Sequence, residues 1–181
     1  RRGSDEKGTS WPVLLRKLKM LQRTGVFDTG KDLGDYSELL KPSTVTVFDV
    51  SGSANVWVNN IVISDILRGL FRAKLADRTE SLPRVLVVIE EAHTFVSKQN
   101  ASKMDMTLDT LRDISRRGRK RWFSLCFISQ QPAHLPAEIY ELCNTKIVHQ
   151  TTGGKNMEAF KDSAGGVNPA IWQELPLLGQ G

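Results

Sequence analysis

The chain has 181 residues, 40% of them hydrophobic and 25% charged, a composition typical of one globular domain that can bury a core. Its longest apolar runs, such as Val85–Ile89, are far shorter than the roughly 20 residues of a membrane-spanning helix, and the N-terminus has no apolar signal region. These features argue against a secreted or membrane-bound protein and predict a cytoplasmic one.

The positive charge is concentrated in one segment. The chain has 25 Lys and Arg against 20 Asp and Glu, a formal net charge of +5, and residues 112–121 hold six basic side chains against one acidic one. Such a local patch predicts contact with phosphates at one place. Cys126 and Cys143 both lie in apolar stretches, which indicates core thiols in a reducing compartment and no disulfide scaffold.

The N-terminal part of the chain is expected to be peripheral. Residues 1–10 lack periodicity and are predicted to be disordered or an irregular edge, and residues 11–43 to be a helical lead-in and linker. Apolar residues from Trp11 to Leu21 recur at helical spacing with basic residues between them, which predicts an amphipathic surface helix.

Strands and helices then alternate along the chain. Strands are predicted at residues 44–50, 85–89, 123–129 and 146–150, and helices around residues 62–71, 104–116 and 137–142. Because the strands are apolar throughout and do not alternate, the pattern predicts an α/β fold with a mostly parallel sheet and helices on both faces. Ligands of such sheets bind beyond the carboxyl ends of the strands.

Two carboxylates follow the strand at residues 85–89. Adjacent residues at a strand end point to different sides, so Glu90 can hold a magnesium ion through water while Glu91 faces a water molecule that attacks a phosphate. This is the logic of a Walker B element. The alternative is two surface glutamates that simply end a strand.

Polar and basic residues surround the next strand. Gln130 and Gln131 follow it and are placed to sense a γ-phosphate, although an ordinary loop opening is the alternative. Residues 115–122 precede it, with Gly118 expected to end a helix and the guanidinium groups expected near the same edge as the carboxylates. Arginine there can neutralise charge on a transferring phosphoryl group. The alternatives are a solvated basic turn or a nucleic-acid patch.

In combination these motifs resemble the HerA branch of the FtsK–HerA superfamily of ring-shaped DNA-translocating ATPases, which are relatives of the VirB4-type secretion ATPases. The resemblance covers most of the chain from Trp11. It is carried by Val-Thr-Val-Phe-Asp-Val-Ser-Gly at 45–52, Val-Ile-Glu-Glu-Ala-His at 88–93, Arg-Arg-Gly-Arg-Lys at 116–120, Ile-Ser-Gln-Gln-Pro at 128–132 and Leu-Pro-Leu-Leu-Gly-Gln-Gly at 175–181.

The resemblance implies a partial RecA-like core of the P-loop NTPase (ASCE) type at residues 44–181, with ATP and Mg²⁺ as cofactors. Glu91 resembles the catalytic base, and Glu90 the acid on the magnesium side, where many relatives carry Asp. Gln130 or Gln131 resembles the polar sensor.

The basic motif has its own implied roles. Arg116 and Arg119 are similar to the arginines that reach a γ-phosphate, often from a neighbouring subunit, and Lys120 is expected to contact the nucleotide. Lys98 and Lys103 lie in a polar stretch that could face the pore of a ring and touch DNA phosphates, although a solvated loop is the simpler interpretation.

The implied activity is that of a hexameric ATP-driven translocase on double-stranded DNA, working with a NurA-type nuclease in DNA end processing. A VirB4-like secretion motor, or a DNA-binding or assembly module with a degenerate ATPase core, remains an alternative. Glu-Glu-Ala-His at 90–93 also matches the DEAH box of monomeric helicases, but the Ser-Ala-Thr companion of that motif is missing.

A usable P-loop is missing from the sequence. Residues 25–32 match its spacing, but Asp32 replaces the hydroxyl that binds magnesium and would repel phosphate. The family that the chain resembles carries its Walker A motif, and a β-barrel before it, upstream of the matched region. The resemblance therefore implies that this chain is the C-terminal part of a nucleotide-binding domain, which we expect to bind ATP poorly by itself. His93, His134 and His149 lack zinc-ligand spacing, so no structural metal is expected; His93 either supports the acid pair or is structural.

Overall fold

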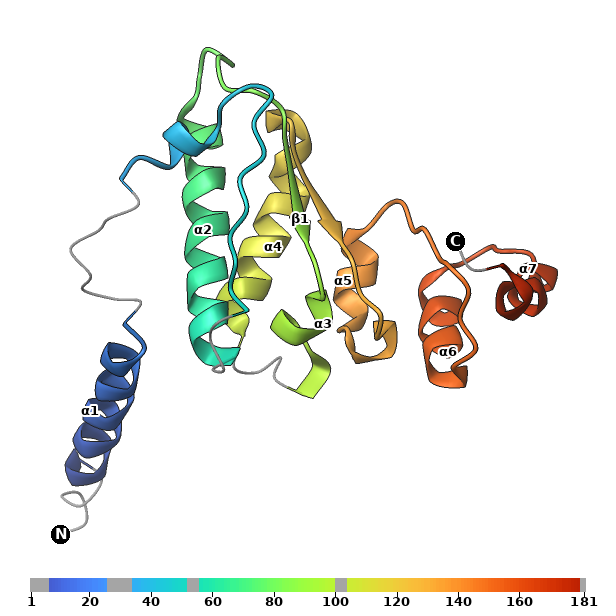
Figure 1. The fold of residues 1–181 in the computed structure, drawn as a ribbon, viewed down its shortest axis with the longest axis horizontal. Helices are drawn as coiled ribbons and strands as arrows, with labels where there is room; N and C mark the ends of the chain where they lie inside the picture. Colours follow the sequence, from blue (N-terminus) through green and yellow to red (C-terminus); the bar gives the residue numbers. More distant parts are fainter. Residues whose placement is uncertain (1–6, 26–33, 52–55, 100–103, 180–181) are drawn as a thin grey trace, which may run out of the picture.

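The computed structural model describes residues 7–25, 34–51, 56–99 and 104–179 (Figure 1). Its two strands are β1 (Val85–Ile89) and β2 (Phe123–Phe127). Its α-helices are α1 (Lys7–Arg23), α2 (Val56–Ala76), α3 (Ala92–Phe95), α4 (Asp105–Arg117), α5 (Ala137–Leu142), α6 (Gly154–Ser163) and α7 (Pro169–Glu174). Short 3-10 helices are η1 (Tyr36–Leu39), η3 (Gly118–Arg121), η4 (Pro132–His134) and η5 (Leu175–Leu177).

The core lies between the sheet and helices α2 and α4. β1 and β2 run parallel, with Val85 opposite Phe123 and Ile89 opposite Phe127. In α4 the buried side chains Leu108, Leu111 and Ile114 recur three residues apart, which is the spacing of one helical face. The predicted α/β class and the parallel pairing of these two strands are therefore confirmed.

Helices on both faces of the sheet were expected, and this expectation is wrong for the described residues. Ile89 is buried in the core, whereas Leu86 and Val88, which point the other way, are 63% and 52% exposed. Side chains alternate between the two faces of a strand, so exposure at these two positions means that one face of β1 is uncovered.

Two predicted strands are also absent. Residues 44–50 and 146–150 are irregular, and within the described residues the sheet contains β1 and β2 alone. Val45 is 88% exposed and Ile147 is 82% exposed. A β-branched run becomes a strand only when a neighbouring strand satisfies its backbone groups and packs against its side chains. Among the residues that the structure describes, neither segment has such a neighbour.

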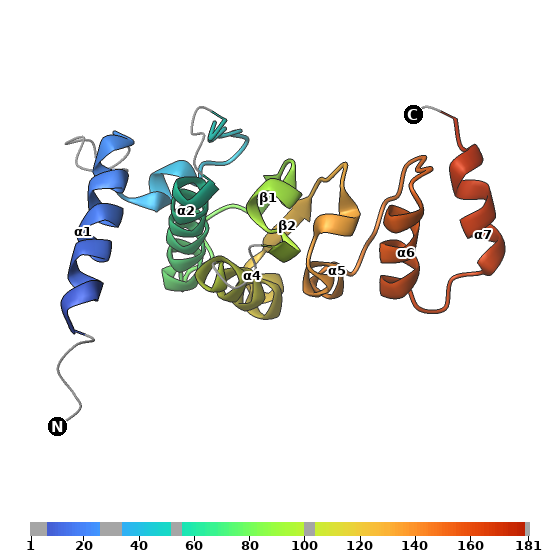
Figure 2. The ribbon, with the colours of Figure 1, turned by 90° about the horizontal axis from the view of Figure 1, so that it is seen from below.

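The N-terminal helix starts earlier than expected. α1 begins at Lys7, within residues 1–10 that were expected to lack structure, and residues 1–6 lie outside the description. Pro12 lies inside the helix near its amino end, where it removes the hydrogen bond to the carbonyl four residues before it and crowds that carbonyl. α1 lies at one end of the molecule and α7 at the other (Figure 2), and the Lys17 Nζ lies 5.0 Å from the centre of the Trp57 ring in α2.

The C-terminal helices support the turn that follows β2. Tyr140 of α5 donates a hydrogen bond of 2.5 Å to the carbonyl of Pro132 in η4, and its ring lies edge-on to Phe160 of α6 at 5.9 Å. Burial raises the pKa of Tyr140 to about 12, so its hydroxyl remains a donor at neutral pH. The Asn156 side chain accepts a hydrogen bond of 3.2 Å from the Ala133 N–H. The segment after β2 is thus held from outside the sheet.

Both cysteines are free thiols, and each is half-buried. Burial raises the pKa of the Cys143 thiol, which keeps it in the neutral form. No helix in the described ranges combines the length and the apolar character needed to cross a bilayer.

Candidate functional site

The backbone brings the carboxyl ends of β1 and β2 together. The Ile128 N–H donates to the Ile89 carbonyl at 3.0 Å, and the Ala92 N–H donates to the Ile128 carbonyl at 2.9 Å. The parallel ladder therefore continues one step beyond both strands, as Figure 1 shows at the lower end of β1. As a result, the residues that follow each strand, 90–91 and 129–130, are neighbours in space.

Glu91 lies at the centre of this edge. The Gln130 Nε2 donates a hydrogen bond of 2.7 Å to Glu91 Oε1, and His93 Nδ1 lies 3.2 Å from Glu91 Oε2. The Glu91 side chain is 39% exposed, so the carboxylate is held by two neighbours and still reaches solvent. The structure therefore unites two residues that the sequence placed in one site, the expected base and the expected sensor.

The backbone of Glu91 is strained. Its φ and ψ are 48° and 45°, in the left-handed region that residues with a side chain seldom adopt. The Thr94 N–H and the Thr94 hydroxyl each donate a 2.8 Å hydrogen bond to the Glu91 carbonyl, which fixes the peptide that carries the strain. Strain of this kind concentrates at functional positions, and here it turns the carboxylate towards Gln130.

Ser129 and His93 extend the contacts of Glu91. His93 Nδ1 lies 3.0 Å from the Ser129 Oγ, and the same oxygen accepts a hydrogen bond of 3.1 Å from the Gln131 N–H. Sequence analysis considered His93 as a support for the acid pair but missed Ser129. The available signal was its position: Ser129 immediately precedes Gln130, at the carboxyl end of the strand that neighbours β1.

Glu90 and Gln131 lie at the same edge of the sheet but are more exposed than Glu91. Both side chains are exposed, and Glu90 lies beside Glu91 at the end of β1. Magnesium binds hard oxygen donors and keeps several waters, so one exposed carboxylate suffices as a partial ligand. Within the described ranges no three His, Cys, Asp or Glu side chains gather in a way that would hold a metal ion. Glu90 is therefore the carboxylate that could support magnesium through water.

The basic segment lies at the other end of the sheet, so the expected shared edge is wrong. Only Trp122 separates η3 from the first residue of β2, and β2 runs parallel to β1, so η3 sits at the amino ends of both strands. Five residues of strand separate the two edges, about 16 Å at ~3.3 Å per residue. Arg116, Arg119 and Lys120 are therefore remote from Glu91 of the same chain.

Three of the six basic side chains in residues 112–121 bind other parts of the same chain. The Arg112 guanidinium bonds both oxygens of Glu138 on α5, at 2.7 Å through Nη2, which lowers the pKa of that carboxyl. Arg117 pairs with Asp113 at 3.0 Å, and Arg121 donates to the Asp77 carbonyl at 3.3 Å.

The other three basic side chains are Arg116, Arg119 and Lys120, the ones to which the family resemblance gave roles. All three are exposed, and in the described part of the chain none makes an ion pair. Gly118 precedes two of them, but its φ of −62° is right-handed, so it does not end α4 in the way that left-handed glycines do. An added Cβ would lie 2.5 Å from the Phe123 carbonyl oxygen, so close approach is what requires glycine there.

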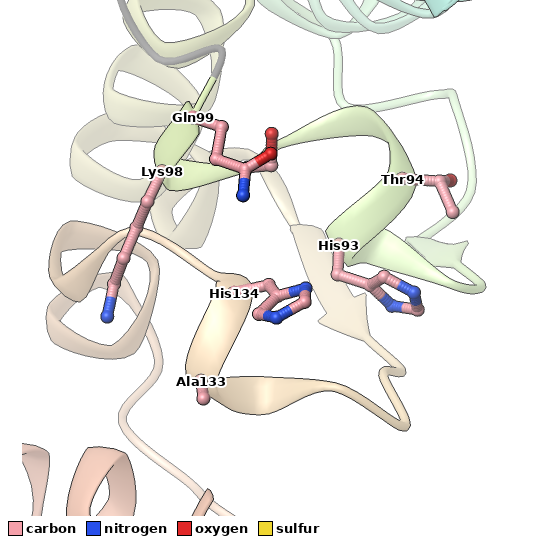
Figure 3. Close-up of a pocket in the computed structure, with 7 residues that line it drawn as sticks. His93, Thr94, Lys98, Gln99, Ala133 and His134 are labelled. Atoms are coloured by element: carbon pink, nitrogen blue, oxygen red, sulfur yellow. The ribbon is translucent and has the colours of Figure 1, made fainter. Parts of the chain in front are cut away.

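A cavity of about 400 Å³ opens beside His93 (Figure 3). The His93 and His134 rings lie edge-on with their centres 6.4 Å apart, and Lys98 and Gln99 line the same space. Lys98 is exposed, whereas Lys103 lies outside the described residues, as does most of the P-loop-like stretch 25–32. The cavity therefore adjoins the carboxylate site from the side of α3 and η4.

Part of the chain is similar to a curated protein. No protein-family model matches the chain. Over 96 residues, 53% of this chain, it is 30% identical to a protein of Methanocaldococcus jannaschii described as a probable helicase. The chain spans 18% of the length of that protein, so the likeness concerns a limited region of it.

Proposed function

We propose that this chain is part of an ATP-driven motor that acts on nucleic acid, of the HerA-like type. The observation that carries the proposal is the 2.7 Å hydrogen bond between Glu91 and Gln130 at the carboxyl ends of two adjacent parallel strands. A base and an amide held together at this edge suit hydrolysis of a phosphoanhydride. The likeness to a probable helicase supports the same direction.

The residues at this edge take distinct roles in the proposal. Glu91 orients the attacking water and accepts its proton, since its carboxylate reaches solvent yet is fixed by Gln130 and His93. Glu90 supports Mg²⁺ through water, and the ion supplies charge neutralisation for the phosphates of ATP when it is bound. Gln130, with Gln131 next to it, senses the γ-phosphate.

The basic residues act between copies. Arg116, Arg119 and Lys120 lie at the opposite edge from Glu91, so in this proposal they serve the nucleotide bound to a neighbouring copy. That arrangement needs head-to-tail contact between copies. The form we propose is a hexameric ring that moves double-stranded DNA and works in the cytoplasm with a NurA-type nuclease. Lys98 and Lys103 would then approach DNA phosphates.

The test is ATP hydrolysis by the full-length gene product with and without duplex DNA, alongside the 181-residue chain. Glu91→Gln should retain ATP binding and lose hydrolysis by ~100-fold or more, as expected when a general base is removed. Glu80→Gln is the matched control, because Glu80 is exposed on a loop and shares the left-handed backbone of Glu91. Equal hydrolysis by Glu91→Gln and the unmodified protein would contradict the proposal.

A second candidate is a DNA-binding or assembly module with a degenerate ATPase core. Arg116, Arg119 and Lys120, which make no ion pair among the described residues, favour it, since an exposed group of cations can bind phosphates without any hydrolysis. In that case Glu91→Gln changes nothing and salt weakens DNA binding steeply. A VirB4-like motor shares the chemistry of the first candidate and differs in its partners.

A further inference from the structure

His93 makes two contacts through one atom. Its Nδ1 lies 3.0 Å from the Ser129 Oγ and 3.2 Å from Glu91 Oε2, so the ring bridges the end of β2 to the carboxylate that follows β1. Glu91 Oε2 is buried and has no well-directed hydrogen bond, although the other oxygen of the same carboxylate receives one from Gln130. His93 is thus the nearest group of opposite polarity to this oxygen.

The surroundings of Nδ1 decide which ring nitrogen carries the proton. An ionised carboxylate only accepts hydrogen bonds, and an unprotonated Nδ1 would turn its lone pair towards Glu91 Oε2 at 3.2 Å. The Ser129 oxygen has two lone pairs, of which one accepts the Gln131 N–H and the other is available to His93. The Ser129 hydroxyl can accept from a protonated Nδ1 or donate to an unprotonated one, so it is compatible with either tautomer. Glu91 Oε2 decides between them, because only a proton on Nδ1 places an N–H dipole, and not a lone pair, 3.2 Å from the carboxylate oxygen.

We propose that His93 is a positioning residue for Glu91, in the Nδ1–H tautomer that the nearby carboxylate favours, with the Ser129 Oγ accepting the hydrogen bond from Nδ1. Gln130 fixes one oxygen of the carboxylate and the His93 N–H attracts the other, so the orientation of the base depends on both strand ends. This inference rests on the proposed function, because it assigns His93 a role in orienting the base of that reaction.

The first experiment reads the tautomer without any activity. Ring-nitrogen chemical shifts of the isotope-labelled 181-residue chain, measured by NMR at a pH where the ring is neutral, should show the Nδ1–H form at His93. Glu91→Gln should shift the population towards Nε2–H, because the amide of glutamine can donate to an unprotonated Nδ1. His149→Gln, which alters an exposed histidine, should not change the His93 signals. An Nε2–H tautomer in the unmodified chain, or no response to Glu91→Gln, would overturn the inference.

The second experiment uses two substitutions that differ in where they put an amide nitrogen. Asn places its amide close to the position of Nδ1, and Gln places it close to that of Nε2. In the full-length protein we expect His93→Gln to lower kcat for ATP hydrolysis by ~10- to 100-fold with KM within about twofold, since misplacement of a catalytic group by about 1 Å has that effect. His93→Asn should recover most of the loss.

The two substitutions separate positioning from a structural role. If His93→Asn and His93→Gln lose kcat equally, the Nδ1 donor is irrelevant and the inference is wrong. If Glu91→Gln hydrolyses ATP at the unmodified rate, the proposed function fails, and the role of His93 fails with it even where the NMR result holds. If Glu91→Gln is inactive and His93→Gln is fully active with unchanged KM, the proposed function survives and the role of His93 alone is refuted.

Discussion

Two glutamates in the same left-handed conformation allow the strain at the site to be measured. Glu91 has φ 48° and Glu80 has φ 54°, but Glu80 sits on an exposed loop, whereas Glu91 is held by Gln130. Replacing each by Asn, which tolerates this backbone region, relieves strain at both positions. The pair therefore separates backbone strain, which both share, from the side-chain contacts that only Glu91 makes.

The expected free energies follow from these contacts. Left-handed backbone costs about 1–2 kcal/mol for an ordinary residue, of which Asn should recover about 0.5–1 kcal/mol. Glu80→Asn should therefore raise the free energy of unfolding by that amount. Glu91→Asn gains the same relief but weakens the Gln130 hydrogen bond, which contributes about 0.5–1 kcal/mol at a partly exposed position, so its stability should stay near that of the unmodified chain.

Urea denaturation of the chain gives the comparison. With a slope of roughly 2 kcal/mol per molar urea, the Glu80→Asn midpoint should rise by ~0.3–0.5 M, while the Glu91→Asn midpoint changes little. A lower midpoint for Glu80→Asn would refute the assignment of strain. If Glu91→Asn stabilises as much as Glu80→Asn, the contacts of the carboxylate contribute nothing to folding.

Two further predictions concern stability. Gly118→Ala should lower the free energy of unfolding by about 1–2 kcal/mol, because a clash with the Phe123 carbonyl oxygen outweighs the ~1 kcal/mol gain in helix propensity. Gly154→Ala is the control: an added Cβ there meets open space, so this variant should be neutral or stabilising. Equal urea midpoints for the two variants would contradict the prediction. Hydrogen bonds to the Asp77 carboxylate, above all the one from the Leu82 N–H, lower the pKa of Asp77 to about 2. The pKa of Asp77 in the folded chain lies below its value in the unfolded chain, near 3.9. The stabilisation by ionised Asp77 is therefore complete above about pH 4 and is lost as the pH falls through 2. The free energy of unfolding of Asp77→Asn should be lower than that of the unmodified chain at pH 7, and the two should converge in acid.

Local sequence patterns were sufficient to predict some elements and to predict which residues meet beyond the carboxyl ends of β1 and β2. β1 and α5 were predicted with their observed bounds, since both are short segments between clear breakers. The meeting of Glu91 and Gln130 followed from one rule, that parallel strands bring their carboxyl ends together.

The placement of the basic segment was wrong for a reason the sequence already contained. Arg119 and Lys120 lie a few residues before the start of β2, and a segment that enters a parallel strand must lie at its amino end. The contact between His93 and Ser129 could not be predicted from the sequence, because it depends on the side-chain rotamers at the ends of two strands. The strand expected at residues 44–50 failed because propensity provides no hydrogen-bonding neighbour.

The separation of Glu91 from Arg119 bears on how a motor built from this chain would work. Glu91 follows the carboxyl end of β1, and the exposed cations precede the amino end of β2. The two paired five-residue strands therefore lie between the carboxylate and the cations. A nucleotide held at the carboxylate edge of one copy and touched by the cations of the next would therefore make the two strands a direct mechanical link between successive sites. Side chains that fix the carboxylate to the strand ends, Gln130 and His93, would then transmit the occupancy of one site to the next copy.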